Sequence, residues 1–318
     1  MIPLDRNLAF RFPLLRGGDV RQAQQALRRA GLVLPADGIF GPGTRDAVLA
    51  FQRARGLVAD GVIGPASWAA LMAAAPPATT MPDWRAVLRP YMARLRAPHG
   101  APVGGAARQW HLSETGIIVD GTQPRAGTPT AARAWATHGL AMQRAAQAHN
   151  VPVELLLATA CTESGGRADA VREEPGYLDD ATTPHRVSPG LMQTLISTAR
   201  EALADPKLDR ARLLQPETSL AAGAAYIRRQ ALGGRVPTGF DPPLVAIAYN
   251  AGSLRPAAGP PGSRSASAQN PWGLVQTRRG DHFHADAFCG FFNDALVVLG
   301  AVPPAPATPS FLLLLRGQ

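Results

Sequence analysis

The sequence predicts a mainly α-helical chain made of two domains, a small one followed by a larger one. The length of 318 residues fits two domains, since a domain has about 100–200 residues. Apolar residues recur at helical spacing over most of the chain, and only Gly116–Asp120 has the apolar run of a strand. The stretch AAAPPATTMP at 73–82 is typical of a linker, so it places the domain boundary near its start.

The first domain is predicted to contain helices that follow a repeated turn. The heptapeptide ADGIFGP at 36–42 returns as ADGVIGP at 59–65. Each copy predicts an Asp-Gly turn, a short apolar pair and a Gly-Pro helix start, because proline is well tolerated at the first helical position. An earlier helix is expected just after Asp19, and another from about Thr44 to Arg55.

The second domain is predicted to be helical from about Thr130 almost to its end. Within it, Pro243–Tyr249 is apolar all round, as expected of a buried helix. The expected division of the chain is 1–72 for the small domain, 73–130 for a linker and a segment of undefined structure, 131–300 for the helical domain, and 301–318 for a Pro-rich tail.

The net charge of +9 comes almost wholly from arginine, because Lys207 is the only lysine. A basic surface favours an anionic partner such as nucleic acid, phospholipid or an acidic wall polymer. The same charge also fits arginines spread over a solvated surface. No run of Lys and Arg is interleaved with aromatic residues, which argues against nucleic acid as the partner.

The two cysteines, Cys161 and Cys289, are too few for a disulfide scaffold. They form no Cys-x-x-Cys pair, so a zinc knuckle is not predicted. One disulfide or two buried free thiols both fit the sequence, and we predict that the two cysteines are not bridged. Cys161 is not predicted to be a nucleophile, because no Cys-His signature surrounds it and an apolar helix raises the pKa of a thiol.

Neither a membrane span nor a signal peptide is predicted. No window reaches the roughly 20 apolar residues of a membrane span. Met1–Phe12 carries charged residues among apolar ones and lacks the apolar stretch of a signal peptide. For action outside the cytoplasm, we therefore expect release by phage-type lysis or by a signal-independent secretion route.

The block at 14–72 carries a specific set of motif residues. They are Arg16-Gly17-Gly18-Asp19-Val20, Leu27, Asp37-Gly38-Ile39-Phe40-Gly41, Thr44, Ala47-Val48, Phe51-Gln52, Asp60-Gly61, Gly64 and Trp68-x-x-Leu71. With these residues the block resembles the peptidoglycan-binding-1 family of small three-helix modules. The resemblance implies non-catalytic binding to the peptide stem or the glycan of the bacterial cell wall.

The site expected from this resemblance is a shallow groove near the two repeated turns. Its candidate wall-binding residues are Asp37, Phe40, Thr44, Asp60 and Ile63. Each of them also fits a structural role. Asp37 and Asp60 have the pattern of turn formers, and Phe40 has that of a core residue.

Glu163 is the candidate catalytic acid. An apolar helix is predicted from Pro152, and Gly165-Gly166 ends it, so Glu163 lies in its last turn. Partial burial and the negative end of the helix dipole both disfavour a charged carboxylate. A glycosidic acid needs this property, because it must hold its proton near neutral pH and deliver it to the leaving oxygen. By itself the segment also fits an ordinary glutamate facing water.

Four further strings follow Glu163-Ser164 in order. They are Ser188-Pro189-Gly190-Leu191-Met192-Gln193, then Leu213-Leu214-x-Pro216-Glu217, then Gly223-Ala224-x-Tyr226-Ile227, and last Ala248-Tyr249-Asn250-Ala251-Gly252. In this order they resemble the soluble lytic transglycosylase family, with goose-type lysozymes as structural cousins. The resemblance covers about 135–300 and implies an α-helical, lysozyme-like domain.

The resemblance also implies roles for individual residues. Glu163 is the sole acid and base, and Met192 and Gln193 line the cleft beside it. Tyr249 supports Glu163 or the reacting sugar, and Asn250 holds its own loop or contacts sugar. Ser188 falls near a family serine that contacts the substrate. The N-acetyl group of the muramoyl sugar assists, and its 6-hydroxyl closes a 1,6-anhydro ring.

Two features depart from the family pattern. Leu195 stands where methionine is expected, and this difference is expected to alter a sugar subsite but not the chemistry. The segment between Glu163 and Ser188 is long and acidic, and it contains Glu173, Glu174, Asp179 and Asp180. One of these carboxylates reaching the cleft to position a water would make the enzyme an inverting hydrolase. A solvated loop is the other interpretation.

No metal or other cofactor is predicted. His282, His284 and Asp286 alternate along the chain, whereas a helical ligand pair has a spacing of four residues, as in H-E-x-x-H. We expect these three residues to flank the start of a Phe-rich helix.

The sequence therefore predicts an enzyme that cleaves the β-1,4 bond between N-acetylmuramic acid and N-acetylglucosamine. The first interpretation is a lytic transglycosylase that forms 1,6-anhydro-N-acetylmuramic acid. A muramidase that adds water to the same bond is one alternative, and a non-catalytic wall-binding protein is another. The predicted partner is peptidoglycan, and the expected oligomeric state is a monomer.

Overall fold

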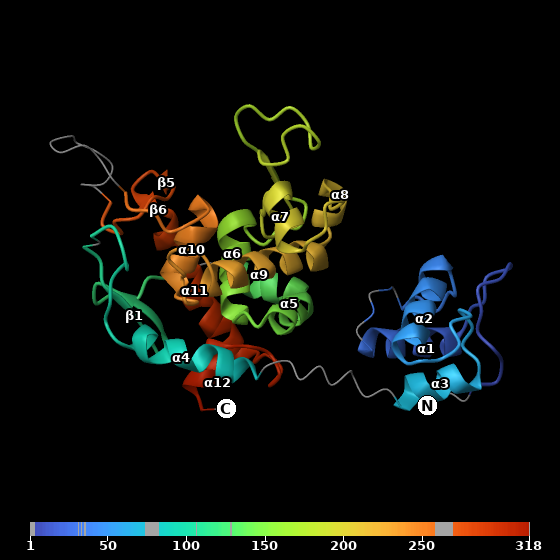
Figure 1. Ribbon diagram of the computed structural model, residues 1–318. Coiled ribbons are helices and arrows are strands. Elements are labelled where there is room, and N and C mark those ends of the chain that lie inside the picture. The colour runs from blue at the N-terminus through green and yellow to red at the C-terminus, as the bar shows by residue number, and fades with distance from the viewer. Residues whose placement is uncertain are drawn as a thin grey trace. The chain divides into compact units, whose positions relative to one another are not determined.

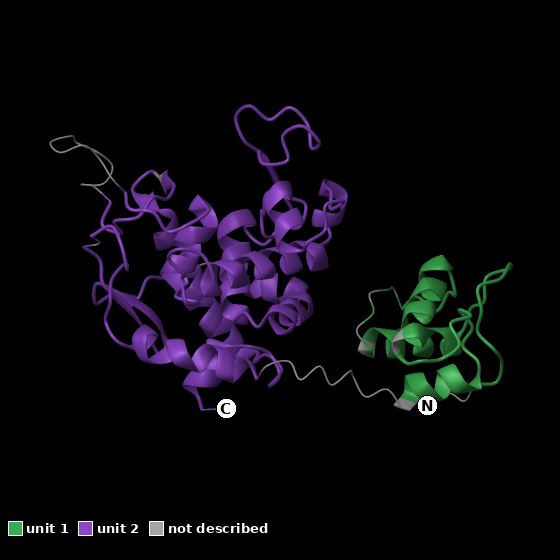
Figure 2. Cartoon of the chain, viewed as in Figure 1, with its two compact units in different colours: residues 1–81 green, residues 82–318 purple. Residues whose placement is uncertain are grey.

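The computed structural model describes residues 4–30, 32, 34, 36–73, 83–105, 107–127, 129–257 and 270–317. The chain divides into two compact units, Met1–Met81 and Pro82–Gln318 (Figure 2). Within the described residues, helices predominate and the strands pair only as short two-stranded antiparallel ladders, which confirms the mainly α expectation. In the same ranges, no helix has the length and apolarity needed to cross a membrane.

The first unit packs three helices on a small core. These are α1 (Gly18–Arg29), α2 (Pro42–Ala54) and α3 (Pro65–Ala73). Each copy of the repeated turn precedes a helix that begins at its proline, as the sequence predicts. The core is formed by apolar side chains from the three helices and from both turns, among them Val20, Leu27, Phe40, Val48, Phe51, Ile63, Trp68 and Leu71.

A buried glutamine holds each copy of the repeated turn. Gln24 Nε2 donates to Asp37 Oδ1 at 2.9 Å and to Thr44 Oγ1 at 3.1 Å, and Gln24 Oε1 accepts from the Gly38 N–H at 2.8 Å. The second copy repeats the pattern from Gln52, whose partners are Asp60 Oδ1 at 2.8 Å, Ser67 Oγ at 3.0 Å and the Gly61 N–H at 2.9 Å. The repeat therefore extends beyond the turn to the glutamine on the preceding helix.

The second unit is a helical body with short strand pairs (Figure 1). Its elements are α4 (Trp84–Arg96), β1 (Trp110–Ser113), β2 (Gly116–Val119), α5 (Thr130–His149), α6 (Val153–Ser164), β3 (Val171–Glu173), β4 (Val187–Pro189), α7 (Ile196–Ala202), α8 (Arg210–Leu213), α9 (Pro216–Leu232), α10 (Pro242–Ala251), β5 (Arg278–Arg279), β6 (His282–Phe283), α11 (His284–Ala301) and α12 (Phe311–Leu315). The strand expected at Gly116–Asp120 is β2, and it pairs with β1.

Helix α6 lies at the centre of this unit. All its residues from Val153 to Cys161 are buried, including the polar Glu154 and Thr159. It contacts α5, α9, α10 and α11. Gly165 adopts a left-handed conformation with φ 65° and ends the helix, as predicted. This ending places Glu163 where the buried helix reaches the surface.

Two segments flanking the expected helical domain also pack in this unit. In the first, His99 Nε2 lies 2.7 Å from Asp241 Oδ2 at the start of α10, and Trp110 Nε1 donates to Asp241 Oδ1 at 2.8 Å. In the second, the buried Glu154 of α6 accepts hydrogen bonds from the start of α12, and Phe311 is fully buried. The compact unit thus includes described parts of both 73–130 and 301–318.

Candidate active site

Glu163 opens onto a cleft in the second unit. Its side chain is 13% exposed, and the cleft has a volume of about 370 Å³. The cleft wall combines the end of α6, the segment from β4 to α7 and the end of α10. The residues that line it are Glu163, Arg172, Glu174, His185, Ser188, Gln193, Thr194, Leu195, Thr198, Tyr226, Tyr249, Asn250, Ala251 and Gly252. Residues from three of the sequence strings thus surround the candidate acid.

His284 is the neighbour of Glu163 that the sequence did not predict. Its Nε2 lies 3.3 Å from Glu163 Oε1, and its side chain is 8% exposed. His284 begins α11, so the packing of α11 on α6 brings the two side chains together. An imidazole at this distance restricts the orientations that the carboxyl group can adopt.

The neighbours of His284 in the sequence have different roles. Asp286 accepts hydrogen bonds from the Phe283 N–H at 2.8 Å and from Trp272 Nε1 at 3.0 Å. His282 is exposed on β6. In the described ranges, no group of three His, Cys, Asp or Glu side chains is placed to hold a metal ion.

The segment from β4 to α7 requires glycine at one position. Gly190 has φ 86°, and a Cβ atom there would lie 2.0 Å from the carbonyl oxygen of Leu213. The segment turns sharply at this point and presents Gln193 to the cleft. Gln193 Nε2 donates to the carbonyl oxygens of Gly190 at 2.8 Å and Ala170 at 3.0 Å, which fixes its side chain.

Tyr249 joins α10 to the same segment. Its hydroxyl donates to the carbonyl oxygen of Met192 at 2.9 Å and lies 2.6 Å from Thr194 Oγ1. Burial raises the pKa of Tyr249, so the hydroxyl stays protonated. Asn250, the next residue, accepts a hydrogen bond from the Thr277 N–H at 2.8 Å. Both side chains line the cleft and also hold its walls together.

Met192 differs from the expectation that it lines the cleft. Its side chain is fully buried, and it packs against Gly223 of α9. A Cβ atom on Gly223 would lie 2.6 Å from Met192 Cε, so the methionine occupies space that only glycine leaves free. What Met192 contributes to the site is its carbonyl oxygen, the acceptor for Tyr249.

The acidic segment from β3 to β4 places one of its four carboxylates at the cleft. Glu174 lines the cleft and lies 3.0 Å from Arg172 Nε. Glu173 and Asp180 both pair with Arg210, at 3.0 Å and 2.7 Å. Asp179 accepts hydrogen bonds from Ala181 and Thr182 of its own loop. Figure 1 shows this loop in yellow-green, projecting from the helical body between α6 and α7.

The candidate wall-binding residues of the first unit are mostly internal. Phe40 and Ile63 are fully buried, and Thr44 is buried beneath the first turn. These three side chains therefore stabilise the fold and are not accessible to a ligand. The Asp37 and Asp60 carboxylates accept hydrogen bonds from backbone N–H groups two residues further on, which lower the pKa of both carboxyls.

Two family models match the chain. Residues 16–71 match the putative peptidoglycan binding domain, and residues 141–258 match the transglycosylase SLT domain. The chain joins a peptidoglycan-binding domain to a transglycosylase SLT domain. It is thus a peptidoglycan lytic transglycosylase or muramidase that acts on the cell wall. The SLT match includes Glu163, Gln193, Tyr249 and Asn250, whereas His284 lies beyond its end.

Comparison with other proteins adds little to the two domain matches. None of the curated proteins matches the chain. Among solved structures, the endolysin of Burkholderia phage AP3 is 21% identical over 77% of this chain and 85% of its own, with a TM-score of 0.23. A TM-score this low carries no argument about fold or function.

Proposed function

We propose that this SLT domain cleaves glycan strands as a lytic transglycosylase in which Glu163 is both acid and base. The observation that carries the proposal is the position of Glu163. It lies at the open end of a buried helix, 13% exposed, in a cleft lined by Ser188, Gln193, Tyr249 and Asn250. From this position the carboxyl group can reach the glycosidic oxygen of a sugar bound in the cleft, as a general acid must.

In the first step, Glu163 donates its proton to the oxygen that links the muramoyl C1 to the next sugar. The C1–O bond breaks, and the carbonyl oxygen of the muramoyl N-acetyl group bonds to C1. In the second step, the Glu163 carboxylate takes the proton of the muramoyl 6-hydroxyl. The 6-oxygen then bonds to C1, the N-acetyl oxygen leaves, and Glu163 is protonated again. No water is consumed.

The other site residues serve these steps by holding positions. His284 Nε2, 3.3 Å from Glu163 Oε1, orients the carboxyl group toward the cleft. Gln193, fixed by two backbone carbonyls, presents its side chain to the sugar beside the acid. Tyr249 keeps this segment at a constant distance from α10. Such preorganisation lowers the cost of reaching the transition state.

A muramidase is the second candidate, and Glu174 is the observation that favours it. Glu174 lines the same cleft as Glu163 and comes from a different element. In an inverting hydrolase a second carboxylate activates water on the opposite face of the sugar. Arg172 Nε, 3.0 Å from the Glu174 carboxylate, holds that carboxylate in place beside the cleft.

Mass spectrometry of products from purified peptidoglycan separates these functions. We expect muropeptides with a 1,6-anhydro end, lighter than the hydrolytic products by one water and unchanged by borohydride. Glu163→Gln removes the acid and abolishes them. Glu217→Gln, at an exposed glutamate of α9, is the matched control and keeps them. Reducing ends that disappear in Glu174→Gln would instead establish the muramidase.

Two expectations about the whole protein stay predictions. The protein is expected to be a monomer. Release by phage-type lysis or by signal-independent secretion is the proposed route to the wall.

A further inference from the structure

The Thr194 hydroxyl is a buried polar group in the wall of the cleft. Thr194 follows Gln193 in the segment from β4 to α7, is 3% exposed and lines the same cleft as Glu163. Within the described residues, its hydrogen-bond partner is Tyr249, with 2.6 Å between Thr194 Oγ1 and the tyrosine hydroxyl oxygen. The direction of this hydrogen bond decides what the threonine oxygen can offer a ligand.

The direction follows from the second partner of Tyr249. The tyrosine hydroxyl has one proton, and it donates this proton to the carbonyl oxygen of Met192 at 2.9 Å. A carbonyl oxygen has no proton to give, so Thr194 must be the donor in its contact with Tyr249. Burial raises the pKa of Tyr249, and the hydrogen bond from Thr194 opposes that rise, as a donor to the phenol oxygen does.

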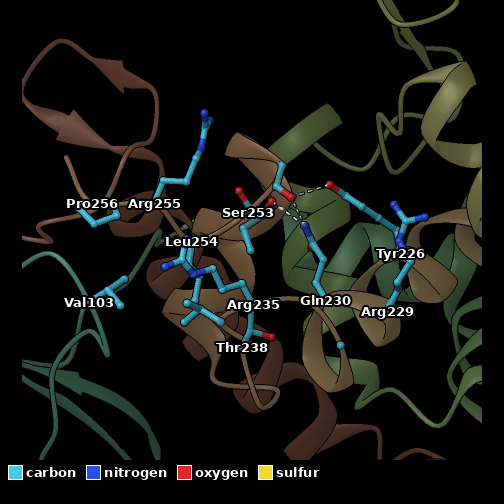
Figure 3. Close-up of a pocket in the computed structure, with 15 residues that line it drawn as sticks. Val103, Tyr226, Arg229, Gln230, Arg235, Thr238, Ser253, Leu254, Arg255 and Pro256 are labelled. Atoms are coloured by element: carbon cyan, nitrogen blue, oxygen red, sulfur yellow. Dashed lines mark hydrogen bonds between the residues drawn. The ribbon is translucent and has the colours of Figure 1, made fainter. Parts of the chain in front are cut away.

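The ring of Tyr249 is packed in this position. It meets the ring of Tyr226 edge-on, with the two ring centroids 5.3 Å apart. Tyr226 also lines the neighbouring pocket drawn in Figure 3, where its hydroxyl donates to the carbonyl oxygen of Gly252 at 3.4 Å. Because the ring is packed, the Tyr249 hydroxyl stays between Thr194 and Met192.

The Thr194 oxygen therefore has acceptor capacity that the described residues do not use. Its proton is given to Tyr249, and its two lone pairs have no donor among those residues. Buried polar atoms are normally paired, and this one lies in the wall of a cleft, so a ligand in the cleft is the natural donor. Thr194 can accept a hydrogen bond from that ligand, but it has no proton to donate to it.

A muramoyl sugar within a glycan strand has few donors. Its O1 and O4 belong to glycosidic bonds, and its O3 carries the lactyl ether. The ring substituents therefore keep two donors, the 6-hydroxyl and the acetamido N–H. The proposed second step gives the proton of the 6-hydroxyl to Glu163, which leaves the acetamido N–H for another acceptor.

We propose that Thr194 Oγ1 accepts a hydrogen bond from the acetamido N–H of the muramoyl sugar. The inference rests on the proposed function, because that function places this sugar beside Glu163. An amide group is planar, with its N–H and its carbonyl oxygen on opposite sides, so fixing the N–H also directs the oxygen. Thr194 then turns the acetamido oxygen toward C1, the atom to which this oxygen bonds in the first step.

The test follows the amide protons of a peptidoglycan tetrasaccharide, labelled with ¹⁵N in its acetamido groups, by NMR as it binds the full chain carrying Glu163→Gln. We expect one muramoyl amide proton to move downfield on binding, because it gains an acceptor. Adding Thr194→Val keeps the size of the side chain and removes its oxygen. The downfield shift should then vanish, and the affinity should fall roughly ten-fold. Thr194→Ser keeps the oxygen and should preserve both.

Two further variants separate contact with the sugar from support of the cleft wall. Thr137→Val is the matched control, since it removes the hydroxyl of an exposed threonine of α5 that does not line the cleft. It should change neither the shift nor the affinity. Tyr249→Phe removes the partner of Thr194 in the wall and leaves the threonine oxygen, so the downfield shift should persist.

Other outcomes overturn the inference. A muramoyl amide proton that does not move downfield, or one whose shift survives Thr194→Val, would show that Thr194 does not touch this group. Equal loss of the shift in Tyr249→Phe would show that Thr194 acts only through the tyrosine. A shift confined to the N-acetylglucosamine amides would place Thr194 at the neighbouring sugar. The protein tested lacks the acid, so a failure of the proposed cleavage reaction appears separately, in the products of the unaltered chain.

Discussion

Glu163 and His284 come from distant parts of the chain and meet at the end of α6. With side chains 13% and 8% exposed, neither carboxyl group nor imidazole is free to rotate into bulk water. We therefore expect the imidazole to help fix the orientation of the Glu163 carboxyl group. Glu163 lies within the residues that match the SLT domain, whereas its neighbour His284 lies beyond their end.

The first prediction concerns His284→Asn. Without Nε2 at 3.3 Å, the Glu163 carboxyl group samples more orientations. We expect kcat on peptidoglycan to fall about ten-fold, while KM changes less than about two-fold, because His284 touches the acid and not the sugar. The measurement is steady-state kinetics with soluble glycan strands.

His282→Asn is the matched control for this prediction. It makes the same change two residues earlier, on an exposed side chain of β6, and should leave both constants unaltered. A His284→Asn protein with wild-type kcat would show that Glu163 does not need the imidazole. A rise in KM alone would show that His284 contacts the sugar instead.

At the scale of residues, the sequence singles out Glu163 as a candidate acid but does not predict the side chain that contacts it. Glu163 is marked by its place before Gly165-Gly166 at the end of an apolar helix. His284 carries no such mark, because only the packing of α11 on α6 makes it a neighbour. The same limit applies to Met192, since its burial depends on the space that Gly223 leaves on another helix.

At the scale of elements, the repeated turn of the peptidoglycan-binding domain is a unit of helix, turn and helix. Gln24 and Gln52 hold the two copies with matching hydrogen bonds. From sequence alone, a polar residue in an amphipathic helix is expected to face solvent. The buried roles of the two glutamines could therefore not be predicted. The turns and the helix starts are visible, because Asp-Gly and Gly-Pro have strong local preferences.

The second prediction follows from that arrangement. Gln24→Leu leaves the buried Gly38 N–H without its acceptor, and it removes a donor from Asp37 and Thr44. We expect the free energy of unfolding of the first unit to fall by about 2–4 kcal/mol. The free energy of unfolding is measured by urea denaturation, with hydrogen exchange of the amides in α1 to α3 as the readout.

Gln25→Leu, at the exposed neighbouring position, is the matched control for the second prediction. Because this side chain lies in solvent, the change should be within about 0.5 kcal/mol. A similar loss in both variants would mean that leucine disturbs α1 itself. No loss in Gln24→Leu would show that water replaces the glutamine at the turn.

At the scale of the whole molecule, each unit has a core of its own. One hydrophobic cluster lies wholly in the first unit and another lies in the second, which fits two domains that fold separately. The division into a wall-binding unit and a cleaving unit follows from length, linker composition and motif order, so it is the part of the fold most accessible from sequence. The packing of α12 against α6 could not be predicted from the sequence, because it depends on hydrogen bonds from the start of α12 to the buried Glu154.

The third prediction concerns the contribution of the peptidoglycan-binding domain. A chain of residues 83–318 keeps the SLT cleft and its hydrophobic core. On insoluble sacculi we expect it to act at least roughly ten-fold more slowly than the full chain at low enzyme concentration, because tethering raises the effective concentration of the cleft at the wall. On soluble disaccharide-peptide oligomers, the shortened chain and the full chain should cleave at equal rates. This comparison controls for damage to the cleft. Equal rates on sacculi would show that the first unit does not retain the enzyme there, and a loss on both substrates would show that the first unit supports the cleft directly.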